Sequence, residues 1–449
     1  MGRRHEREPQ ILPHKRPVKE PSTAAAIERE RSPLKKAGKI LGPGFITGAS
    51  DDDPSGIGTY AIAGASFGLS LLWTALLTYP LMAAVQDICA RVGMISGEGL
   101  AGVLRRHYPR PLLYGAVTLL FVANVINIGA DLRAVADAVH LLTGVAALWL
   151  VVPVAGALVA LQIVGSYRLI ANTFKWLTLA LLAYVADAVI VRPELGETLR
   201  ATVIPTFSFD PSYFAALIAI FGTTISPYLF FWQSAEEVEE EVEIGRTTRA
   251  ARRGASRSEL RYKAMDVAVG MAFSNGVMYF IILATGLTLA RSGKTDINSA
   301  ADAAEALRPI AGDLAGALFA IGMIGAGLLA VPILSGSAAY ALAEALGWRY
   351  GLDAPWHRAK SFYAVIVGAT ALGVALDFSG VNPIDALFWT AVVNGAVAPP
   401  LLVLVMLAAR NSKVMGRQVV RGWLALLGWV ATAAMFVALS AFLVVTIFR

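Results

Sequence analysis

The sequence has few charged residues and almost no cysteine. Charged residues make up 16% of its 449 positions, against about 25% in soluble domains. Apolar residues make up 56%, and the mean hydropathy is +0.61. The single cysteine, Cys89, excludes an internal disulfide bond and a thiolate metal cluster. This composition excludes a disordered chain and argues against the roughly three soluble domains that the length alone would suggest.

Motifs of catalysis and of nucleic-acid binding are also missing. Only five histidines occur, and none shares a segment with a motif-like acidic cluster. No His-Glu-x-x-His, Gly-x-Ser-x-Gly or Cys-x-x-Cys motif is present. The net charge is +6, but the Lys and Arg residues are spread over many segments and do not mark one face of a domain. We therefore expect no enzymatic activity, no cofactor and no nucleic-acid partner.

Long apolar runs are what the sequence has in abundance. A helix needs about 20 mostly apolar residues to cross a bilayer, and eleven stretches of the chain come close to that. They lie near residues 45–67, 69–89, 112–134, 141–163, 174–191, 214–232, 267–290, 315–346, 362–376, 384–408 and 423–448. The sequence thus predicts an all-α membrane protein with 11 transmembrane helices.

The Lys and Arg residues indicate how these spans cross the membrane. If the N-terminus is cytoplasmic, 31 of the 38 Lys and Arg residues fall in cytoplasmic segments and 7 fall outside. Cytoplasmic loops of membrane proteins carry such an excess. The bias predicts a multi-pass protein of the plasma membrane, with its N-terminus in the cytoplasm and its C-terminus outside.

Three regions of the chain differ in composition. Residues 1–40 carry five prolines among mixed charges and lack the apolar core of a signal peptide, which predicts a disordered basic cytoplasmic tail. Residues 41–410 hold the first ten spans, and residues 411–449 hold a cytoplasmic loop and the eleventh span. The basic tail would either contact anionic membrane lipid or set the topology without any partner.

The first span is interrupted by charged residues. Asp51, Asp52 and Asp53 follow one another in mid-span and precede Pro54. A charged side chain at membrane depth costs about 2.5 kcal/mol or more, and proline removes a backbone donor. Three carboxylates in this place must therefore face water, a cation or other parts of the protein.

The sixth span has a matching interruption around Thr223, Ser226 and Pro227. Each interrupted span opens a block of five spans, at about residues 41–192 and 213–410. Because five is an odd number, the second block is inverted relative to the first. Paired broken helices in two inverted repeats indicate a transporter with a central binding site. Since the breaks hold carboxylates and hydroxyls but no Lys or Arg, the expected ligand is a cation.

Other interpretations of three features remain open. Pro54 and Pro227 would also fit kinks in packed helices, which membrane helices tolerate, although a kink does not require carboxylates. Asn394 in the tenth span fits either a ligand or a helix–helix hydrogen bond. The glutamate-rich stretch 236–243 would either hold exiting cations or pair with the arginines that follow it.

At these residues the chain resembles the Nramp family of divalent-metal transporters over spans one to ten. The similar motifs are Gly-Pro-Gly at residues 42–44, Asp53-Pro54, residues 86–93 ahead of residues 97–101, Asp131-Leu132, and the break at Pro227. The resemblance implies a LeuT-like fold with a five-plus-five inverted repeat and broken helices one and six. It also implies that Asp53 binds the transported metal.

Four positions depart from the usual Nramp pattern. Gly56 replaces an asparagine, Ser226 and Tyr228 replace a methionine and a histidine, and Asn124 replaces a glutamate of the proton route. These changes resemble the Nramp-related magnesium transporters, a branch that also carries manganese. Ligand chemistry agrees, because carboxylate, hydroxyl and carbonyl oxygens suit Mg²⁺ and Mn²⁺ whereas a thioether suits softer metals.

The expected function is uptake of Mg²⁺ and Mn²⁺ by alternating access, without proton coupling because Tyr228 and Asn124 do not suit a proton relay. The expected metal ligands are Asp53, Gly56, Thr223 and Ser226, with Asp52, Tyr228 and Asn394 as secondary candidates. The alternatives are a proton-coupled Mn²⁺/Fe²⁺ transporter of the usual Nramp type and a cation-coupled symporter of organic solutes. The expected partners are the metal ion and membrane lipid, with no obligatory protein partner.

Overall fold

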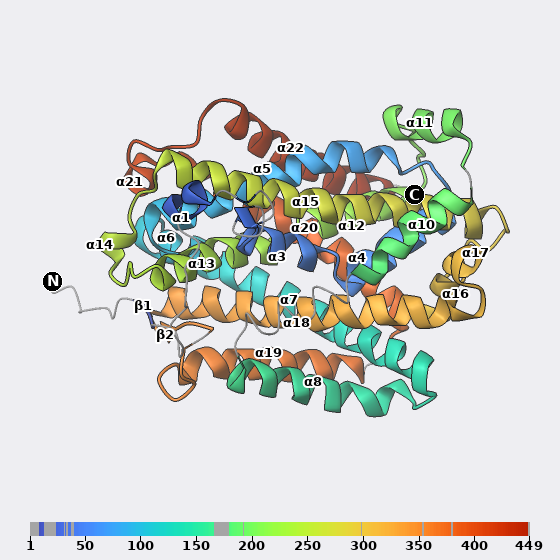
Figure 1. The fold of residues 1–449 in the computed structure, drawn as a ribbon, viewed down its shortest axis with the longest axis horizontal. Coiled ribbons are helices and arrows are strands. Elements are labelled where there is room, and N and C mark those ends of the chain that lie inside the picture. The colour runs from blue at the N-terminus through green and yellow to red at the C-terminus, as the bar shows by residue number, and fades with distance from the viewer. Residues whose placement is uncertain are drawn as a thin grey trace.

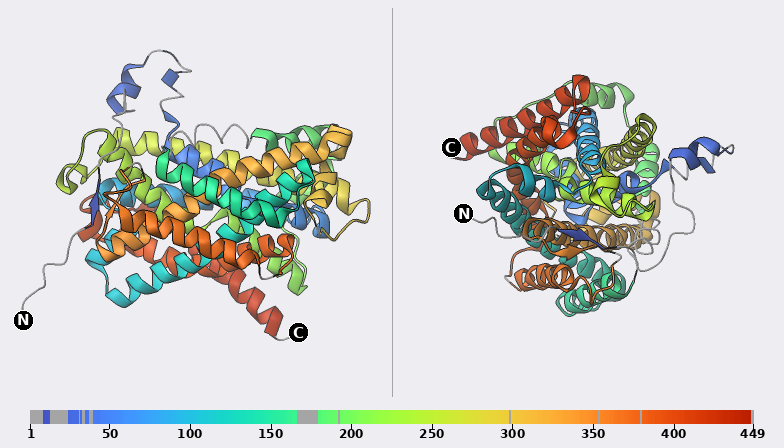
Figure 2. Two further views of the ribbon diagram at one scale, coloured as in Figure 1. Left: turned by 90° about the horizontal axis from the view of Figure 1, so that it is seen from below. Right: turned by 90° about the vertical axis from the view of Figure 1, so that its left-hand side faces the viewer.

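The fold is a bundle of long helices that run side by side (Figure 1), and the described residues include one pair of two-residue strands at one end. The computed structural model describes residues 9–12, 24–30, 32, 35–36, 40–165, 179–191, 193–297, 299–352, 354–378 and 380–447. The view along the bundle shows helices on all sides of a central group (Figure 2).

Eight helical stretches in the described residues are long and apolar enough to cross a membrane. They contain the helices α7 (Arg110–Thr143), α8 (Ala147–Val164), α12 (Pro211–Thr224) with α13 (Pro227–Glu243), α15 (Arg257–Thr285) with a π-helical turn (Gly286–Ala290), α18 (Ala315–Leu346), α19 (Lys360–Asp377), α20 (Pro383–Arg410) and α22 (Gly422–Ile447). The chain is thus a mostly helical, multi-pass membrane protein.

Three of the eleven predicted spans are not among these eight stretches. The first is divided between α3 (Pro43–Asp51) and α4 (Pro54–Phe67), and each half is short. The second corresponds to α5 (Trp73–Ser96), which carries Asp87 and Arg91. The fifth, near residues 174–191, lies partly outside the described residues and ends in α10 (Ala183–Ile190). The count of eleven therefore stays a prediction.

Short helices connect the long ones or cap the ends of the bundle. The remaining helices are α1 (Ala24–Arg29), α6 (Leu100–His107), α11 (Leu195–Val203), α14 (Arg249–Arg252), α16 (Ala300–Ala304), α17 (Arg308–Ala311) and α21 (Ser412–Met415). Three 3₁₀ turns add Leu179–Leu182, Glu305–Leu307 and Gly312–Leu314.

Two elements lie within the first 40 residues, the region expected to be disordered. The strand β1 (Gln10–Ile11) pairs in parallel with β2 (Arg349–Tyr350). The helix α1 places Ile27 in a buried position at 4% exposure. Both elements lie at the same end of the bundle (Figure 1). Residues 1–8 and 13–23 lie outside the described part of the chain.

Close packing of α3 against α15 positions the first helix break. A Cβ atom on Gly48 would lie 2.2 Å from the backbone of Gly270, and one on Gly270 would lie 2.3 Å from the carbonyl oxygen of Gly44. Only glycine allows the two backbones to approach this closely. The lone cysteine, Cys89 on α5, is also packed inside the bundle, at 1% exposure.

Candidate metal site at two broken helices

Both predicted breaks are present in the structure. The helix α3 ends at Asp51, and α4 begins at Pro54 with Asp53 as its N-cap. Asp51, Asp52 and Asp53 are all buried, at 0%, 0% and 2% exposure. The proline ends one helix and starts the next because its ring pre-sets the helical φ angle and it needs no amide partner at that position.

The Asp53 carboxylate is held by three donors. Its Oδ1 accepts from the Gly56 amide at 2.7 Å and from the Ser55 hydroxyl at 2.8 Å. Its Oδ2 accepts from Asn127 Nδ2 of α7 at 3.0 Å. A carboxylate offers about four lone-pair sites, so Asp53 retains accepting capacity for a cation after these bonds. Its orientation is fixed by donors from α4 and α7.

The second break supplies hydroxyl oxygens. The helix α12 ends at Thr224, and Ser226 is the N-cap of α13 but makes no cap hydrogen bond. Thr223 donates its hydroxyl proton to the Ile220 carbonyl at 3.0 Å, and Ser226 donates its proton to the carbonyl of either Gly222 or Thr223. Because the protons point back into their own helix, the hydroxyl lone pairs stay available to a cation.

Contacts between the two breaks bring the predicted residues together. The Tyr228 hydroxyl on α13 donates to the Ser50 carbonyl at the end of α3, at 3.1 Å, and it also interacts with Asp53. Ser226 interacts with Asp51 in the same region. Tyr228 therefore links the two breaks. Its hydroxyl bonds to one of the helix-end carbonyls that would otherwise face a cation.

Asp51 and Asp52 share a single hydroxyl donor. Ser274 Oγ on α15 lies 2.8 Å from Asp51 Oδ2 and 3.1 Å from Asp52 Oδ1. One hydroxyl has one proton, so it cannot serve both carboxylates at once. Asp51 Oδ1 and Asp52 Oδ2 are buried without any hydrogen-bond partner among the described residues. This arrangement leaves two carboxyl oxygens without a partner among the described residues close to Asp53.

Two residues that contact the aspartates, Asn127 and Ser274, are not among those predicted from the sequence. Asn127 lies on α7 between Asn124 and Asp131, one helical turn from each. That spacing puts the three polar side chains on one face of the helix, a signal that was present in the sequence. Ser274 carries no comparable signal, because its contact with Asp51 joins residues 223 positions apart.

The other candidate residues have different surroundings. Asn394 on α20 is 2% exposed, and its Nδ2 finds no partner among the described residues. Asn124 donates to the Leu334 carbonyl of α18 at 2.8 Å, which is a helix–helix bond. Asp131 is fully buried with both carboxylate oxygens unpartnered in the described structure. Arg133, which the sequence placed near Asp131, pairs instead with Asp137 at 3.2 Å.

The chemistry of the breaks suits a hard cation. Among the residues that the structure describes, no Lys, Arg or His pairs with the three aspartates, and no group of three His, Cys, Asp or Glu side chains converges as a metal cage. A cation between the breaks would therefore meet a carboxylate, hydroxyls, carbonyls and water. Mg²⁺ takes such ligands, usually one or two carboxylates and several waters.

Hydrogen bonds and ion pairs hold the N-terminal end of α3 against α15. Asp266 on α15 accepts from the amides of Gly42, Gly44 and Phe45 at 2.8, 2.8 and 2.9 Å. Lys263 lies 3.5 Å from Asp266, 3.1 Å from Glu237 and 2.8 Å from Glu240. The carboxylate at a helix N-terminus is favourable, and the lysine joins α15 to α13.

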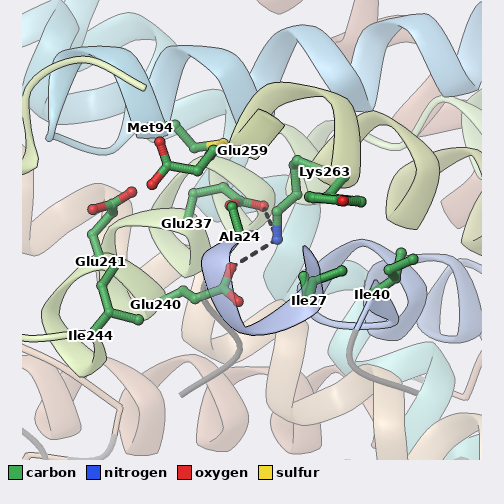
Figure 3. A pocket seen from close by; sticks show the side chains of 11 residues that line it. Ala24, Ile27, Ile40, Met94, Glu237, Glu240, Glu241, Ile244, Glu259 and Lys263 are labelled. Atoms are coloured by element: carbon green, nitrogen blue, oxygen red, sulfur yellow. Dashed lines mark hydrogen bonds and ion pairs between the residues drawn. The ribbon is translucent and has the colours of Figure 1, made fainter. Parts of the chain in front are cut away.

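The glutamate-rich stretch is largely paired in this network. Figure 3 shows Lys263 between Glu237 and Glu240 in a small pocket of about 60 Å³, with Ile27 of α1 among its walls. Glu241 pairs with Arg246 at 2.6 Å. These contacts favour the interpretation in which the glutamates pair with neighbouring cations.

Solved structures with the same fold are membrane transporters. A manganese transporter from Eremococcus coleocola superposes with a TM-score of 0.68 at 18% sequence identity, over 95% of this chain and 88% of that chain. The protein MhsT, solved in complex with L-phenylalanine, superposes with a TM-score of 0.58 at 16% identity, over 90% of this chain and 97% of that chain. The chain thus has a LeuT-like fold with two broken helices.

Sequence comparison identifies the family. The Nramp model, described as natural resistance-associated macrophage protein-like, matches residues 44–446. The divalent metal cation transporter MntH of Bacillus subtilis (strain 168) is 25% identical over 418 residues, which cover 91% of this chain and 92% of that protein. MntH of Klebsiella pneumoniae (strain 342) is 25% identical over 431 residues, 94% of this chain and 98% of that protein. The chain therefore belongs to the Nramp family, as predicted, whose members are metal-ion transporters and not enzymes.

Proposed function

We propose that this chain carries Mg²⁺ and Mn²⁺ across the plasma membrane by alternating access between the two helix breaks. The observation that carries the proposal is the buried Asp53 carboxylate at the first break, which Gly56 and Asn127 orient. Thr223 and Ser226 would add hydroxyl ligands from the second break. Relatives that match most of the chain are named divalent metal cation transporters, and one structural neighbour is a manganese transporter.

The preference for Mg²⁺ follows from small residues and oxygen ligands. A Cβ atom on Gly56 would lie 3.3 Å from Asp53 Oδ1 and 3.4 Å from the Tyr60 ring. The absence of that atom leaves space beside the carboxylate. Because Mg²⁺ gives up its water reluctantly, a wider gap at Gly56 and Ser226 would admit an ion that keeps part of its hydration shell. Asp52, Tyr228 and Asn394 would assist through water.

We further propose that transport is not coupled to protons. Asn124 cannot titrate, and its amide is engaged with the Leu334 carbonyl. Tyr228 stands where a histidine would relay protons and donates to a backbone carbonyl instead. The flux would then carry net charge into the cell down the gradient of the ion.

The membrane arrangement belongs to the same proposal. Eleven spans, with a cytoplasmic N-terminus and an external C-terminus, place 31 of 38 Lys and Arg residues on the cytoplasmic side. The breaks in α3–α4 and α12–α13 would then open two inverted repeats of five spans each, at about residues 41–192 and 213–410. The gap between the breaks would lie near the middle of the bilayer.

Uptake into proteoliposomes tests the proposal directly. Wild-type protein should take up Mg²⁺ and Mn²⁺ in competition, without stoichiometric acidification of the lumen, and Asp53→Ala should abolish uptake while the protein remains folded. Acidification in step with Mg²⁺ entry would contradict the uncoupled mechanism. Full activity of Asp53→Ala would overturn the assignment of the gap as the ion pathway.

A second variant tests the ligand at Ser226. Ser226→Met introduces the thioether found in most Nramp members, and soft ligands favour the softer transition metals. The ratio of Mn²⁺ to Mg²⁺ uptake should therefore rise. No change in this ratio would mean that residue 226 does not face the ion.

Two alternatives have specific support and are separated by the same assay. The MntH relatives are named divalent metal cation transporters, and a proton-coupled Mn²⁺/Fe²⁺ transporter would carry Fe²⁺ but not Mg²⁺. The likeness to MhsT, solved with L-phenylalanine, favours a cation-coupled symporter of organic solutes. For that function, calorimetry should show that the protein binds an amino acid, and this binding should require the metal.

A further inference from the structure

A large basic pocket opens at the end of the bundle that carries β1 and β2, away from the two helix breaks (Figure 1). Its volume is about 1010 Å³, and it lies between the first turns of α7 and α19, the end of α18 and the strand β2. The basic side chains that line it are Arg105, Arg110, Arg349, His357, Arg358 and Lys360. No Asp or Glu is among the described residues that line it.

Three of these cations have no acidic partner in the part of the chain that the structure describes. Arg349, Arg358 and Lys360 are exposed, and the described residues offer them no ion pair. Like charges in one concavity repel each other and produce a strong positive potential. A bound anion would relieve this repulsion.

Two helix N-termini add to the positive potential. The helices α7 and α19 begin at Arg110 and Lys360, have 34 and 18 residues, and make no side-chain cap hydrogen bond. The first amides of a helix lack intrahelical partners, and the helix dipole is positive at this end. Ser361 adds a hydroxyl to the same wall. Phosphate groups commonly bind to such helix ends.

The position of the pocket indicates that the phosphate belongs to a membrane lipid. The helices α7, α18 and α19 are each long and apolar enough to cross a membrane, and the pocket lies at their ends, where lipid headgroups would be. Exposed Tyr114 and Leu346 line it, and exposed Trp356 adjoins His357. Aromatic and apolar side chains around a basic pocket suit a lipid at the membrane interface, because the acyl chains can pack against them.

We propose that this pocket binds the phosphate headgroup of an anionic phospholipid. The arginines and the two helix N-termini hold the phosphate, and the aromatic rim contacts the glycerol and acyl chains. The bound lipid would join α7, α18, α19 and the strand β2 at one end of the bundle. This binding is independent of the metal proposed at Asp53.

The test compares two triple variants of the full-length protein in detergent. Arg349→Ala/Arg358→Ala/Lys360→Ala removes the unpaired cations of the pocket. Arg410→Ala/Lys413→Ala/Arg417→Ala removes three exposed cations near α21 at the same end of the molecule and serves as the control. Binding of short-chain phosphatidylglycerol and phosphatidylcholine is measured by native mass spectrometry, and the unfolding temperature confirms that each variant is folded.

The expected result is a loss of phosphatidylglycerol affinity of about tenfold or more in the pocket variant and less than about twofold in the control. Phosphatidylcholine binding should not change. Equal losses in both variants would overturn the proposal. So would inorganic phosphate that binds the wild type as tightly as phosphatidylglycerol does, since this would identify a site for soluble phosphate. If the triple variant does not fold, Arg358→Ala alone should weaken phosphatidylglycerol binding about threefold, and an unchanged affinity would contradict the proposal.

Discussion

At the scale of single residues, Asp53 is prepared for a cation by its neighbours. The amide of Gly56 and the hydroxyl of Ser55 orient one carboxylate oxygen, and Asn127 orients the other. The Asn127 Oδ1 atom has no hydrogen-bond partner in the described structure. A side chain that donates to the main ligand while keeping a free acceptor is positioned both to orient Asp53 and to meet the ion or one of its waters.

Replacement of Asn127 should therefore impair ion binding more than folding. Asn127→Ala removes a hydrogen bond to a charged group, which is worth about 1.5–3 kcal/mol, so the KM for Mg²⁺ should rise by about tenfold or more. Asn124→Ala is the matched control, because Asn124 lies one turn away on α7 and bonds only a backbone carbonyl. Proteoliposome uptake measures both. A rise in KM that is equal for the two variants would show that Asn127 has no special role.

At the scale of helices, the contact between α3 and α15 depends on glycine. Gly270→Ala would place a methyl group 2.3 Å from the Gly44 carbonyl, and overpacking of this kind typically costs about 1–3 kcal/mol. Gly276→Ala on the same helix meets nothing within 4 Å, and alanine favours a helix over glycine. The unfolding temperature in detergent should fall for Gly270→Ala and stay or rise for Gly276→Ala. Equal effects would contradict the close contact.

The hydrogen bonds that Asp266 accepts should slow local unfolding at the start of α3. Asp266→Ala removes the acceptor of three α3 amides, so hydrogen exchange at Gly42, Gly44 and Phe45 should accelerate by about tenfold or more, since charged hydrogen bonds contribute about 1.5–3 kcal/mol. Ser256→Ala is the control, because it removes the cap of α15 but leaves Asp266 in place. Unchanged exchange in Asp266→Ala would show that other contacts hold the end of α3.

The helix breaks could be predicted from the sequence, but several of their contacts could not. Proline next to carboxylates in the first apolar run, and proline next to hydroxyl residues in the sixth, identifies each interruption locally, and α3–α4 and α12–α13 follow it. The bonds from Asp266 to the start of α3 and from Ser274 to Asp51 join residues more than 220 positions apart. Such pairings depend on how α15 crosses α3, and hydrophobic periodicity does not contain that information.

At the scale of the whole molecule, metal binding should stabilise the fold. A ligand that binds only the folded state adds about 2.7 kcal/mol to the unfolding free energy at 100 times its Kd. Mg²⁺ should therefore raise the unfolding temperature of the wild type, and EDTA should reverse the rise. Asp53→Ala should show neither effect. An equal shift in the variant would place the stabilising ion elsewhere, for example among surface carboxylates.

The single buried cysteine has a practical consequence for measuring the proposed alternating-access movement. Cys89 is 1% exposed on α5, so the native chain should be almost unreactive toward maleimide dyes while it is folded. A cysteine introduced at exposed Ser66, near the end of α4, would then carry the only fluorophore. Single-molecule fluorescence could therefore be measured without replacing Cys89, because this residue would not be labelled.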